Sequence, residues 1–235
     1  YAGVKGDLIV CRQVLEHLAE PAGFLQGVRK SIGDREAVVF FEVPNGRFTL
    51  QQIRIWDLIY EHPSYFTRAS LRRLFRSNGF EVLDLEETFG DQFLTIEAAA
   101  GWKQASPQRD VDIKLDTLLQ DALIFRRRYH EKILEWQSRL GEIKKEGIKA
   151  VLWGAGSKGV SFLNMLSITE QIEYVIDINP RKWGKFIAGS GHEIQPPEFL
   201  RSIRPEAVII TNENYRSEIS TYLSEFKISA EIYVA

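Results

Sequence analysis

The feature that most constrains the fold is a glycine-rich turn between an apolar run and a helical pattern in the second half of the chain. Residues 150–153 form the apolar run, Gly154, Gly156 and Gly159 follow it, and the helical pattern continues to Met165. Glycines at this spacing let the backbone turn tightly where a strand passes into a helix. This order predicts a parallel α/β sheet of the Rossmann-like kind.

The same turn bears on ligand binding. The amino end of the predicted helix offers free N–H groups and a partial positive charge to a phosphate. Asp177 ends the next apolar run, near the spacing of about 20 residues at which an acidic group meets a ribose hydroxyl. The candidate nucleotide-binding residues are therefore Gly154, Gly156, Ser157, Lys158, Gly159 and Asp177. The alternative stays open that the glycines only pack the strand against the helix, without a ligand.

Strands and helices also alternate along the rest of the chain. Apolar runs predict strands at 7–11, 37–41, 80–87, 93–99, 173–177, 207–211 and 231–234, the first of them buried in a parallel sheet. Helical patterns cover 13–29, 68–77, 197–202 and 215–226. Pro21 interrupts or restarts the first helix, Thr67 is the expected N-cap of the second, and Gly90 marks a turn between two strands. The first half therefore predicts the trailing part of a parallel sheet, closed by an antiparallel hairpin.

A polar linker at 101–107 and a long helical pattern at 111–145 separate the two halves. The apolar members of this helix are too numerous for a free linker, so we expect much of it to pack against its neighbours. The basic triplet Arg126-Arg127-Arg128 is by default a solvated face, with a phosphate clamp as the alternative. We therefore expect three parts, at 1–100, 101–148 and 149–235.

Composition narrows the function classes. A formal net charge of −2 gives no overall basic field for nucleic acid or an anionic membrane, and no apolar run approaches the length of a membrane span. The single cysteine, Cys11, excludes a disulfide within this chain and an all-cysteine zinc site, and its apolar neighbours suggest an inert buried thiol. We expect a cytoplasmic protein. The chain opens at Tyr1 and enters a strand almost at once, so we interpret it as a fragment.

The segment 59–66 concentrates groups that can do chemistry. Tyr60, Glu61, His62 and Tyr65 put a carboxylate, an imidazole and two phenols into one short run. Histidine titrates near neutral pH, and a carboxylate can orient it, so Glu61 and His62 can form a proton-transfer pair. The alternative is a solvated pair in a surface loop.

The other histidines give weaker signals. His17 follows the first predicted strand, where a cofactor could rest, although a structural role is the simpler interpretation. His192 stands in a polar, glycine-rich loop with no second ligand at useful spacing, so we predict no metal site.

At this point two segments resemble known proteins. Residues 7–17, Asp-Leu-Ile-Val-Cys-Arg-Gln-Val-Leu-Glu-His, resemble the fourth-strand segment of class I S-adenosylmethionine-dependent methyltransferases. Tyr60-Glu61-His62 with Tyr65, followed by the turn at 154–159 and Asp177, resembles the sugar C-methyltransferases. That family consists of three-domain enzymes that methylate a carbon of a keto sugar carried on a nucleotide diphosphate.

The resemblance implies roles for named residues. His62 would be the general base, Glu61 would orient it, and Tyr60 would help to hold the substrate. Asn45 and Tyr65 would belong to the substrate site, with the glycine turn and Asp177. The edge of the methyl-donor site would lie at Cys11, Arg12 and Glu16. Many family members carry a further histidine between the tyrosine and the glutamate, whereas Tyr60 here is followed directly by Glu61.

The family's main S-adenosylmethionine loop and its zinc domain would lie upstream of Tyr1. We therefore expect this chain alone to be inactive, and S-adenosylmethionine to leave its thermal melting unchanged. Two other interpretations remain open. In one, residues 149–235 bind a nucleotide or NAD and the first half is a non-catalytic scaffold. In the other, the long helix mediates a homodimer.

Overall fold

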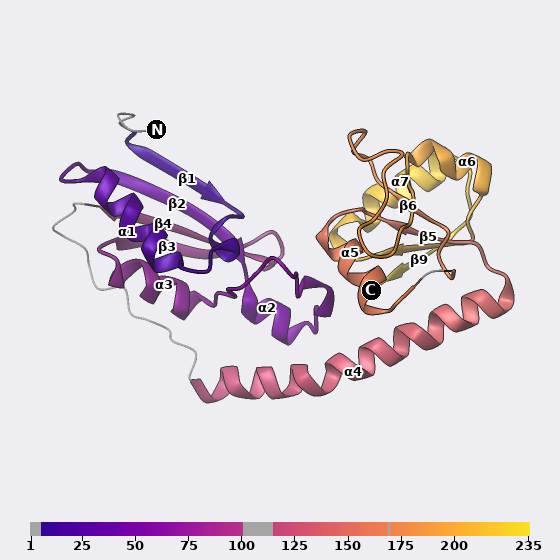
Figure 1. The fold of residues 1–235 in the computed structure, drawn as a ribbon, viewed down its shortest axis with the longest axis horizontal. Coiled ribbons are helices and arrows are strands. Elements are labelled where there is room, and N and C mark those ends of the chain that lie inside the picture. Colours follow the sequence, from indigo (N-terminus) through magenta and orange to yellow (C-terminus); the bar gives the residue numbers. More distant parts are fainter. Residues whose placement is uncertain (1–5, 101–114, 169) are drawn as a thin grey trace. The chain divides into compact units, whose positions relative to one another are not determined.

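The computed structural model describes residues 6–100, 115–168 and 170–235 (Figure 1). They form two compact units, the first from residues 1–54 and 60–126, the second from residues 55–59 and 127–235. The second unit therefore begins inside the long helix rather than at residue 149, and it takes five residues from the first half of the chain. The predicted linker at 101–107 and the predicted helix start at 111–114 lie outside the described residues.

The first unit contains a four-stranded sheet in the order β1-β2-β4-β3. Strand β1 (Leu8–Arg12) runs parallel to β2 (Ala37–Pro44), which pairs antiparallel with β4 (Phe93–Ala100). Strand β3 (Glu81–Thr88) pairs antiparallel with β4 at the edge. The predicted hairpin is confirmed, and its turn has positive φ at Phe89, Gly90 and Asp91.

Short-range signals explain where the helices of this unit begin. Helix α1 (Pro21–Ile32) begins at the proline, which tolerates the first helical position because the N–H it lacks would be unsatisfied there. The preceding residues form only a single 3₁₀ turn, η1 (Leu15–His17), so the helix predicted over 13–29 restarts at Pro21. Helix α3 (Arg68–Ser77) has the predicted N-cap, because the Thr67 hydroxyl accepts from the Ser70 N–H at 3.2 Å.

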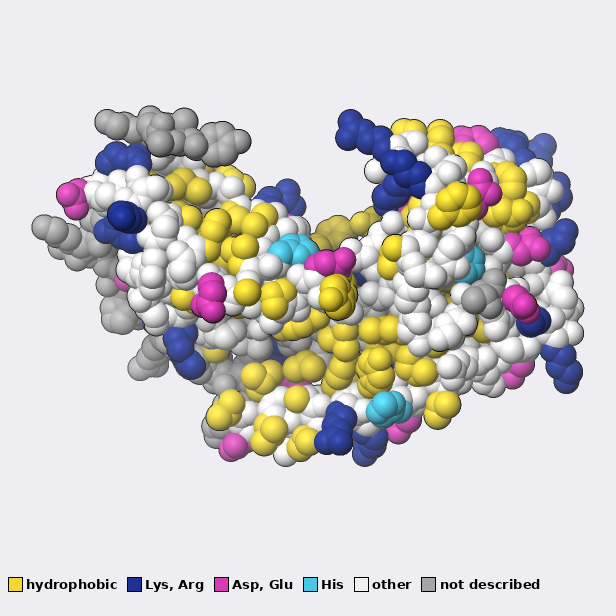
Figure 2. Space-filling view, in the orientation of Figure 1, with side chains coloured by type: hydrophobic (Ala, Val, Ile, Leu, Met, Phe, Trp, Pro, Cys, Tyr) yellow, Lys and Arg dark blue, Asp and Glu magenta, His cyan; other side chains and the backbone are white. Residues whose placement is uncertain are grey.

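Strand β1 differs from its prediction. It was expected to be buried, but Leu8 and Val10 are 61% and 57% exposed. Among the described strands β1 pairs only with β2, so it is an edge strand, and the alternating exposure along it shows that one of its faces is uncovered in this structure. Figure 2 shows hydrophobic side chains at the surface over β1. Cys11, expected to be fully buried, lies on the other face, where it packs against the core and is half-buried.

The second unit contains a fully parallel five-stranded sheet in the order β7-β6-β5-β8-β9. Its strands are β5 (Ala150–Trp153), β6 (Tyr174–Ile176), β7 (Ile194–Gln195), β8 (Ala207–Ile210) and β9 (Glu231–Val234). Its helices include α5 (Ser157–Met165), α6 (Leu200–Ile203) and α7 (Arg216–Glu225), with 3₁₀ turns η3 (Pro197–Phe199) and η4 (Glu213–Tyr215). The Rossmann-like prediction is confirmed, and among the described strands of this sheet the two-residue β7 was missed.

A segment from the first half completes the core of this unit. The 3₁₀ turn η2 (Ile55–Asp57) follows α2 (Gly46–Gln51) along the chain. Its Trp56 is fully buried, with its ring 4.8 Å from that of Phe162 on α5. Phe162 in turn lies 5.2 Å from the ring of Trp136 on the long helix. This aromatic cluster explains why residues 55–59 belong to the second unit.

The long helix α4 (Leu115–Glu146) is confirmed over its described length. One set of its apolar side chains is buried: Phe125, Trp136, Leu140 and Ile143. Another set is exposed: Leu115, Leu119, Leu123, Ile124 and Leu134.

In the part of the chain that the structure describes, none of the helices combines the length and the apolar character that a membrane crossing requires.

Candidate functional site

The segment 60–66 docks onto the 3₁₀ turn η1 and onto the end of strand β2. The Ser64 N–H donates to the Glu16 carbonyl at 3.4 Å, and the Gly46 N–H donates to the Phe66 carbonyl at 2.8 Å. Turn η1 follows β1 and Gly46 follows β2, so both anchors lie at the carboxyl ends of neighbouring parallel strands. The edge of an α/β sheet where reacting groups usually collect is therefore occupied here by the histidine segment.

Gly46 is required for this docking. A Cβ at this position would lie 3.1 Å from the Phe66 carbonyl oxygen and 3.3 Å from Cβ of Tyr65. The Phe66 carbonyl is a backbone group, and backbone moves aside less easily than the end of a flexible side chain. A glycine after β2 therefore sets the distance between the strand end and the histidine segment.

Two imidazole rings meet where these segments join. The ring of His62 lies 4.6 Å from that of His17, at an angle of 78°, and 6.2 Å from the ring of Tyr65. The Nδ1 of His17 lies 3.0 Å from the carbonyl oxygen of Glu61. Because a carbonyl oxygen only accepts, Nδ1 carries the proton in this contact and Nε2 keeps its lone pair when the ring is neutral. His17, for which the sequence favoured a structural role, thus lies beside His62.

Glu16 is the carboxylate of this cluster. Its side chain is 1% exposed, and neither carboxylate oxygen has a hydrogen-bond partner. Burial raises its pKa, as does the neighbouring Glu42, while its own N–H and His17 act in the opposite direction. One of its oxygens and one ring nitrogen each of His17 and His62 lie within 4.8 Å of one another. The sequence predicted no metal site, but these three groups are of the kind that bind metal ions.

The other residues predicted at the methyl-donor edge are differently placed. The Arg12 guanidinium forms a two-pronged pair with the Glu42 carboxylate, with N···O distances of 3.0 to 3.2 Å. Burial, and then the charge of Glu16, raise the pKa of the Cys11 thiol. Arg12 is thus engaged and Glu16 faces the histidines. The assignment of Cys11, Arg12 and Glu16 to the edge of the methyl-donor site stays a prediction.

The remaining residues of the predicted site do not all join the cluster. The Tyr60 side chain is 99% exposed and Tyr65 is 41% exposed. Glu61 is exposed and makes its contact with His17 through its backbone carbonyl. The carboxylate beside His62 is that of Glu16, which follows the first strand rather than preceding the histidine.

Asn45, predicted to bind substrate, has a structural role in this fold. It is 3% exposed and caps helix α2, accepting from the N–H groups of Arg47 and Phe48 at 3.1 and 3.4 Å. Its amide nitrogen donates to the Asp91 carbonyl at 3.0 Å. Both ends of the side chain are therefore in use inside the protein as a helix cap, and the substrate contact of Asn45 stays a prediction.

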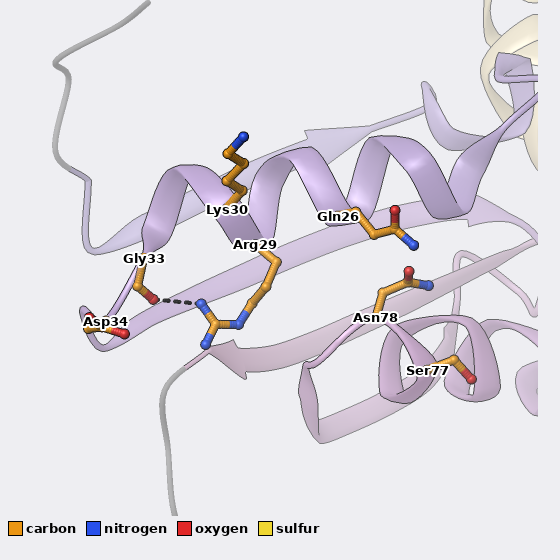
Figure 3. Close-up of a pocket in the computed structure, with 7 residues that line it drawn as sticks. All are labelled: Gln26, Arg29, Lys30, Gly33, Asp34, Ser77 and Asn78. Carbon is orange, nitrogen blue, oxygen red and sulfur yellow. Dashed lines mark hydrogen bonds between the residues drawn. The ribbon is translucent and has the colours of Figure 1, made fainter.

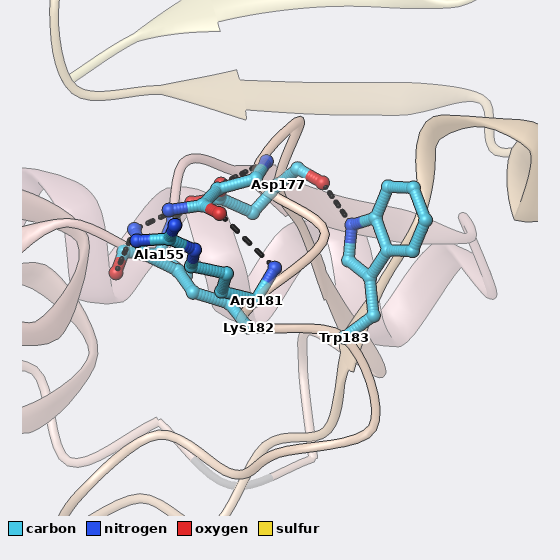
Figure 4. Close-up of polar contacts among 6 residues, drawn as sticks. Ala155, Asp177, Arg181, Lys182 and Trp183 are labelled. Carbon is cyan, nitrogen blue, oxygen red and sulfur yellow. Dashed lines mark hydrogen bonds and ion pairs between the residues drawn. The ribbon is translucent and has the colours of Figure 1, made fainter.

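In the second unit, the Asp177 side chain forms a hydrogen bond with the backbone of the glycine turn (Figure 4). Its carboxylate accepts from the backbone N–H groups of Ala155 and Asn179, each at 2.8 Å, and from Lys182 Nζ at 2.9 Å. Burial alone would raise the pKa of Asp177, but these hydrogen bonds outweigh it and the pKa is lowered. Its backbone carbonyl accepts from the Trp183 indole at 2.7 Å. The predicted ribose contact is thus replaced by contacts with the protein itself.

The other polar groups of the turn are also engaged. Lys158 Nζ donates to Oδ2 of Asp57 at 3.1 Å and lies 2.9 Å from Oδ1, which accepts no hydrogen bond of good geometry. A Cβ at Gly159 would lie 2.1 Å from the Gly154 carbonyl oxygen. Gly156 and Ser157 are exposed at the start of α5. These contacts support the packing interpretation of Gly154, Gly156 and Gly159, and leave only the amino end of α5 open.

His192 and the arginine triplet follow their simpler interpretations. His192 is buried, with Nε2 2.9 Å from the Ile172 carbonyl and Nδ1 2.9 Å from the Ser190 hydroxyl. Burial lowers its pKa, and the hydrogen bond to Ile172 only partly offsets this. Arg126, Arg127 and Arg128 are exposed, and Arg128 pairs with Glu131 on the same helix.

A surface hollow lies elsewhere on the first unit, between the carboxyl ends of α1 and α3 (Figure 3). It is lined by Gln26, Arg29, Lys30, Asp34, Ser77 and Asn78. Its central group, Arg29, donates to the carbonyls of Gly33 and Gly79 at 2.6 and 3.2 Å. The hollow therefore lacks the imidazoles and the buried carboxylate of the cluster around His62.

Comparison with known proteins gives matches over both halves of the chain. The family model described as C-methyltransferase C-terminal domain matches residues 110–234, which is more than half of the chain. A model described as methyltransferase domain matches residues 3–85. The C-methyltransferase NovU of Streptomyces niveus is 26% identical over 231 residues. That alignment covers 93% of this chain and 54% of NovU, so the chain spans about half the length of this curated relative.

Similarities to solved structures are weaker. Magnesium protoporphyrin IX methyltransferase from Synechocystis PCC 6803 with bound SAH is 21% identical, with a TM-score of 0.32 over 42% of this chain and 46% of that one. RSP, a Rex-family repressor, is 18% identical, with a TM-score of 0.31 over 52% and 61%. At these scores neither similarity carries an argument about function.

Proposed function

Because this chain belongs to the C-methyltransferase family, we propose that it is part of an S-adenosylmethionine-dependent enzyme that methylates a carbon next to a carbonyl group. His62 is the general base in this proposal, and the observation that carries it is the docking of the His62 segment at the carboxyl ends of β1 and β2. The substrate we propose is a keto sugar linked to a nucleotide diphosphate. The reaction takes place in the cytoplasm.

The proton transfer follows from the chemistry of a ketone. A C–H bond beside a carbonyl group breaks, its proton passes to a ring nitrogen of His62, and the electron pair is left as an enolate. When bound, S-adenosylmethionine would supply a sulfonium methyl group for this carbon, with its S–CH₃ bond breaking and the neutral thioether leaving. The exposed phenol of Tyr65, whose ring lies 6.2 Å from that of His62, is the proposed hydrogen-bond donor to the enolate oxygen.

The residues near His62 have different roles in this proposal. Glu61 acts through its carbonyl, which holds the His17 ring beside His62. Tyr60, fully exposed in this structure, would meet the substrate only from the solvent side. Within the second unit, the open amino end of α5 at Gly156 and Ser157 is a candidate phosphate-binding position.

The test uses the complete protein, with labelled S-adenosylmethionine and a panel of nucleotide-linked keto sugars. We expect His62→Asn to lower methyl transfer by about 10²- to 10⁴-fold, the usual contribution of general base catalysis. His130→Asn is the matched control, because His130 is an exposed histidine on helix α4. Full activity of His62→Asn would refute the assignment of the base.

The competing interpretation is a nucleotide- or NAD-binding module. The structure offers it little, because Asp177 and Lys158 are engaged by protein groups. Calorimetry of this chain with NAD tests it directly. Tight binding of NAD, together with no methyl transfer in the complete protein, would favour the module over the enzyme.

A further inference from the structure

We propose that Glu16, His17 and His62 form a binding site for a divalent transition-metal ion such as Zn²⁺. Two imidazole nitrogens and one carboxylate oxygen are a donor set found in zinc sites that keep a coordination position open. One donor atom from each of the three residues lies within 4.8 Å of the other two. Atoms that share one zinc ion are about 3 to 4 Å apart. A small inward movement of the side chains therefore completes the site.

The state of Glu16 is the observation that points to a cation. A carboxylate that is 1% exposed and accepts no hydrogen bond of good geometry on either oxygen is energetically unfavourable. Arginine is the usual compensating group, but Arg12 is committed to Glu42. A cation held between the carboxylate and the two imidazoles supplies the missing charge.

His17 is already oriented as a metal-binding histidine is. Such histidines donate one ring N–H to a backbone carbonyl or a carboxylate, which fixes the tautomer and turns the other nitrogen toward the metal. The Nδ1–H of His17 donates to the Glu61 carbonyl at 3.0 Å in this way, so Nε2 is available. The Glu61 carbonyl is itself fixed, because the Ser64 N–H of the same segment is anchored on the Glu16 carbonyl.

Metal binding has a consequence for catalysis, and this part of the inference depends on the proposed function. A metal ion bound to His62 takes the lone pair that proton abstraction needs. The same imidazole therefore cannot act as a ligand and as a base at one time. Zinc is then an inhibitor of methyl transfer, and a chelator restores activity.

The test is calorimetric titration of the 235-residue chain with zinc chloride, with cobalt(II) as a spectroscopic probe of coordination. We expect one zinc ion per chain, and an affinity at least about tenfold lower in Glu16→Gln and in His62→Asn, because each removes a ligand. His130→Asn is the matched control, because it keeps the three donors. Circular dichroism and thermal melting establish that each variant is folded.

Three results would overturn the inference: no zinc binding by the wild-type chain, unchanged affinity in Glu16→Gln, or loss of binding in His130→Asn. If Glu16→Gln does not fold, His62→Asn decides the question, because the His62 side chain is only half-buried. Zinc binding is measured without substrate. Methyl transfer that depends on His62 without zinc binding would therefore refute the metal site alone, and zinc binding without methyl transfer would refute the proposed function alone.

Discussion

Replacing Gly159 with alanine tests whether the glycine turn of the second unit exists for packing. The added Cβ would lie 2.1 Å from the Gly154 carbonyl oxygen, 3.3 Å from the carbonyl carbon and 3.4 Å from Cδ2 of Leu152. A carbon and an oxygen normally stay more than 3 Å apart, and the obstacle here is backbone. Helix α5 must therefore move away from the end of β5 by about 1 Å.

Such overpacking typically costs about 1 to 3 kcal/mol, and more where backbone has to shift. We place the loss for Gly159→Ala at about 3 kcal/mol or more, which lowers the melting temperature of a unit of this size by about 10 °C or more. Gly156→Ala is the matched control, because a Cβ there meets no atom within 4 Å and its φ is −89°. Its cost should stay within about 1 kcal/mol.

Urea unfolding followed by tryptophan fluorescence measures both variants. Four of the five tryptophans, Trp56, Trp136, Trp153 and Trp183, lie in the second unit, so the signal reports mainly on that unit. Wild-type stability of Gly159→Ala would refute the close approach of α5 to the turn. Equal destabilisation by both substitutions would refute the distinction between a packing glycine and an open one.

Three further changes probe the second unit by the same assay. Lys158→Met should cost about 1 to 3 kcal/mol, because the Asp57 side chain is only 14% exposed and loses its cation; adding Asp57→Asn should recover part of this loss. Asp177→Asn should cost about 2 to 3 kcal/mol, since Lys182 then lacks its carboxylate, and wild-type stability would contradict this. His192 binds a proton below about pH 6.5 in the unfolded chain, whereas burial in the folded protein lowers its pKa. The free energy of unfolding should therefore fall on acidification until the pH passes the lowered pKa of the folded state. His192→Gln should flatten this slope.

The sequence by itself determined the alternation of elements and the fold class. Apolar runs, Pro21, Thr67 and Gly90 act through local backbone preferences, so they located most helices, strands and turns without knowledge of the partners. The glycine spacing also identified the strand-to-helix turn of the second unit. The segment 59–66 was singled out because a carboxylate, an imidazole and two phenols stand together in one short run.

Only the tertiary structure decided what those residues touch. Glu16 and His17 lie about 45 positions from His62, and their meeting depends on two hydrogen bonds between distant segments, one between backbone groups and one from the His17 ring to a backbone carbonyl. Trp56 joins the second unit because its ring fits against Phe162, a contact that no local pattern encodes. Asp177 and Asn45 are residue types that often bind ligands, but here their side chains form hydrogen bonds with other groups of the protein. Local propensity is a property of neighbouring residues, whereas the free energy of a polar side chain depends on which groups the whole fold brings within its reach.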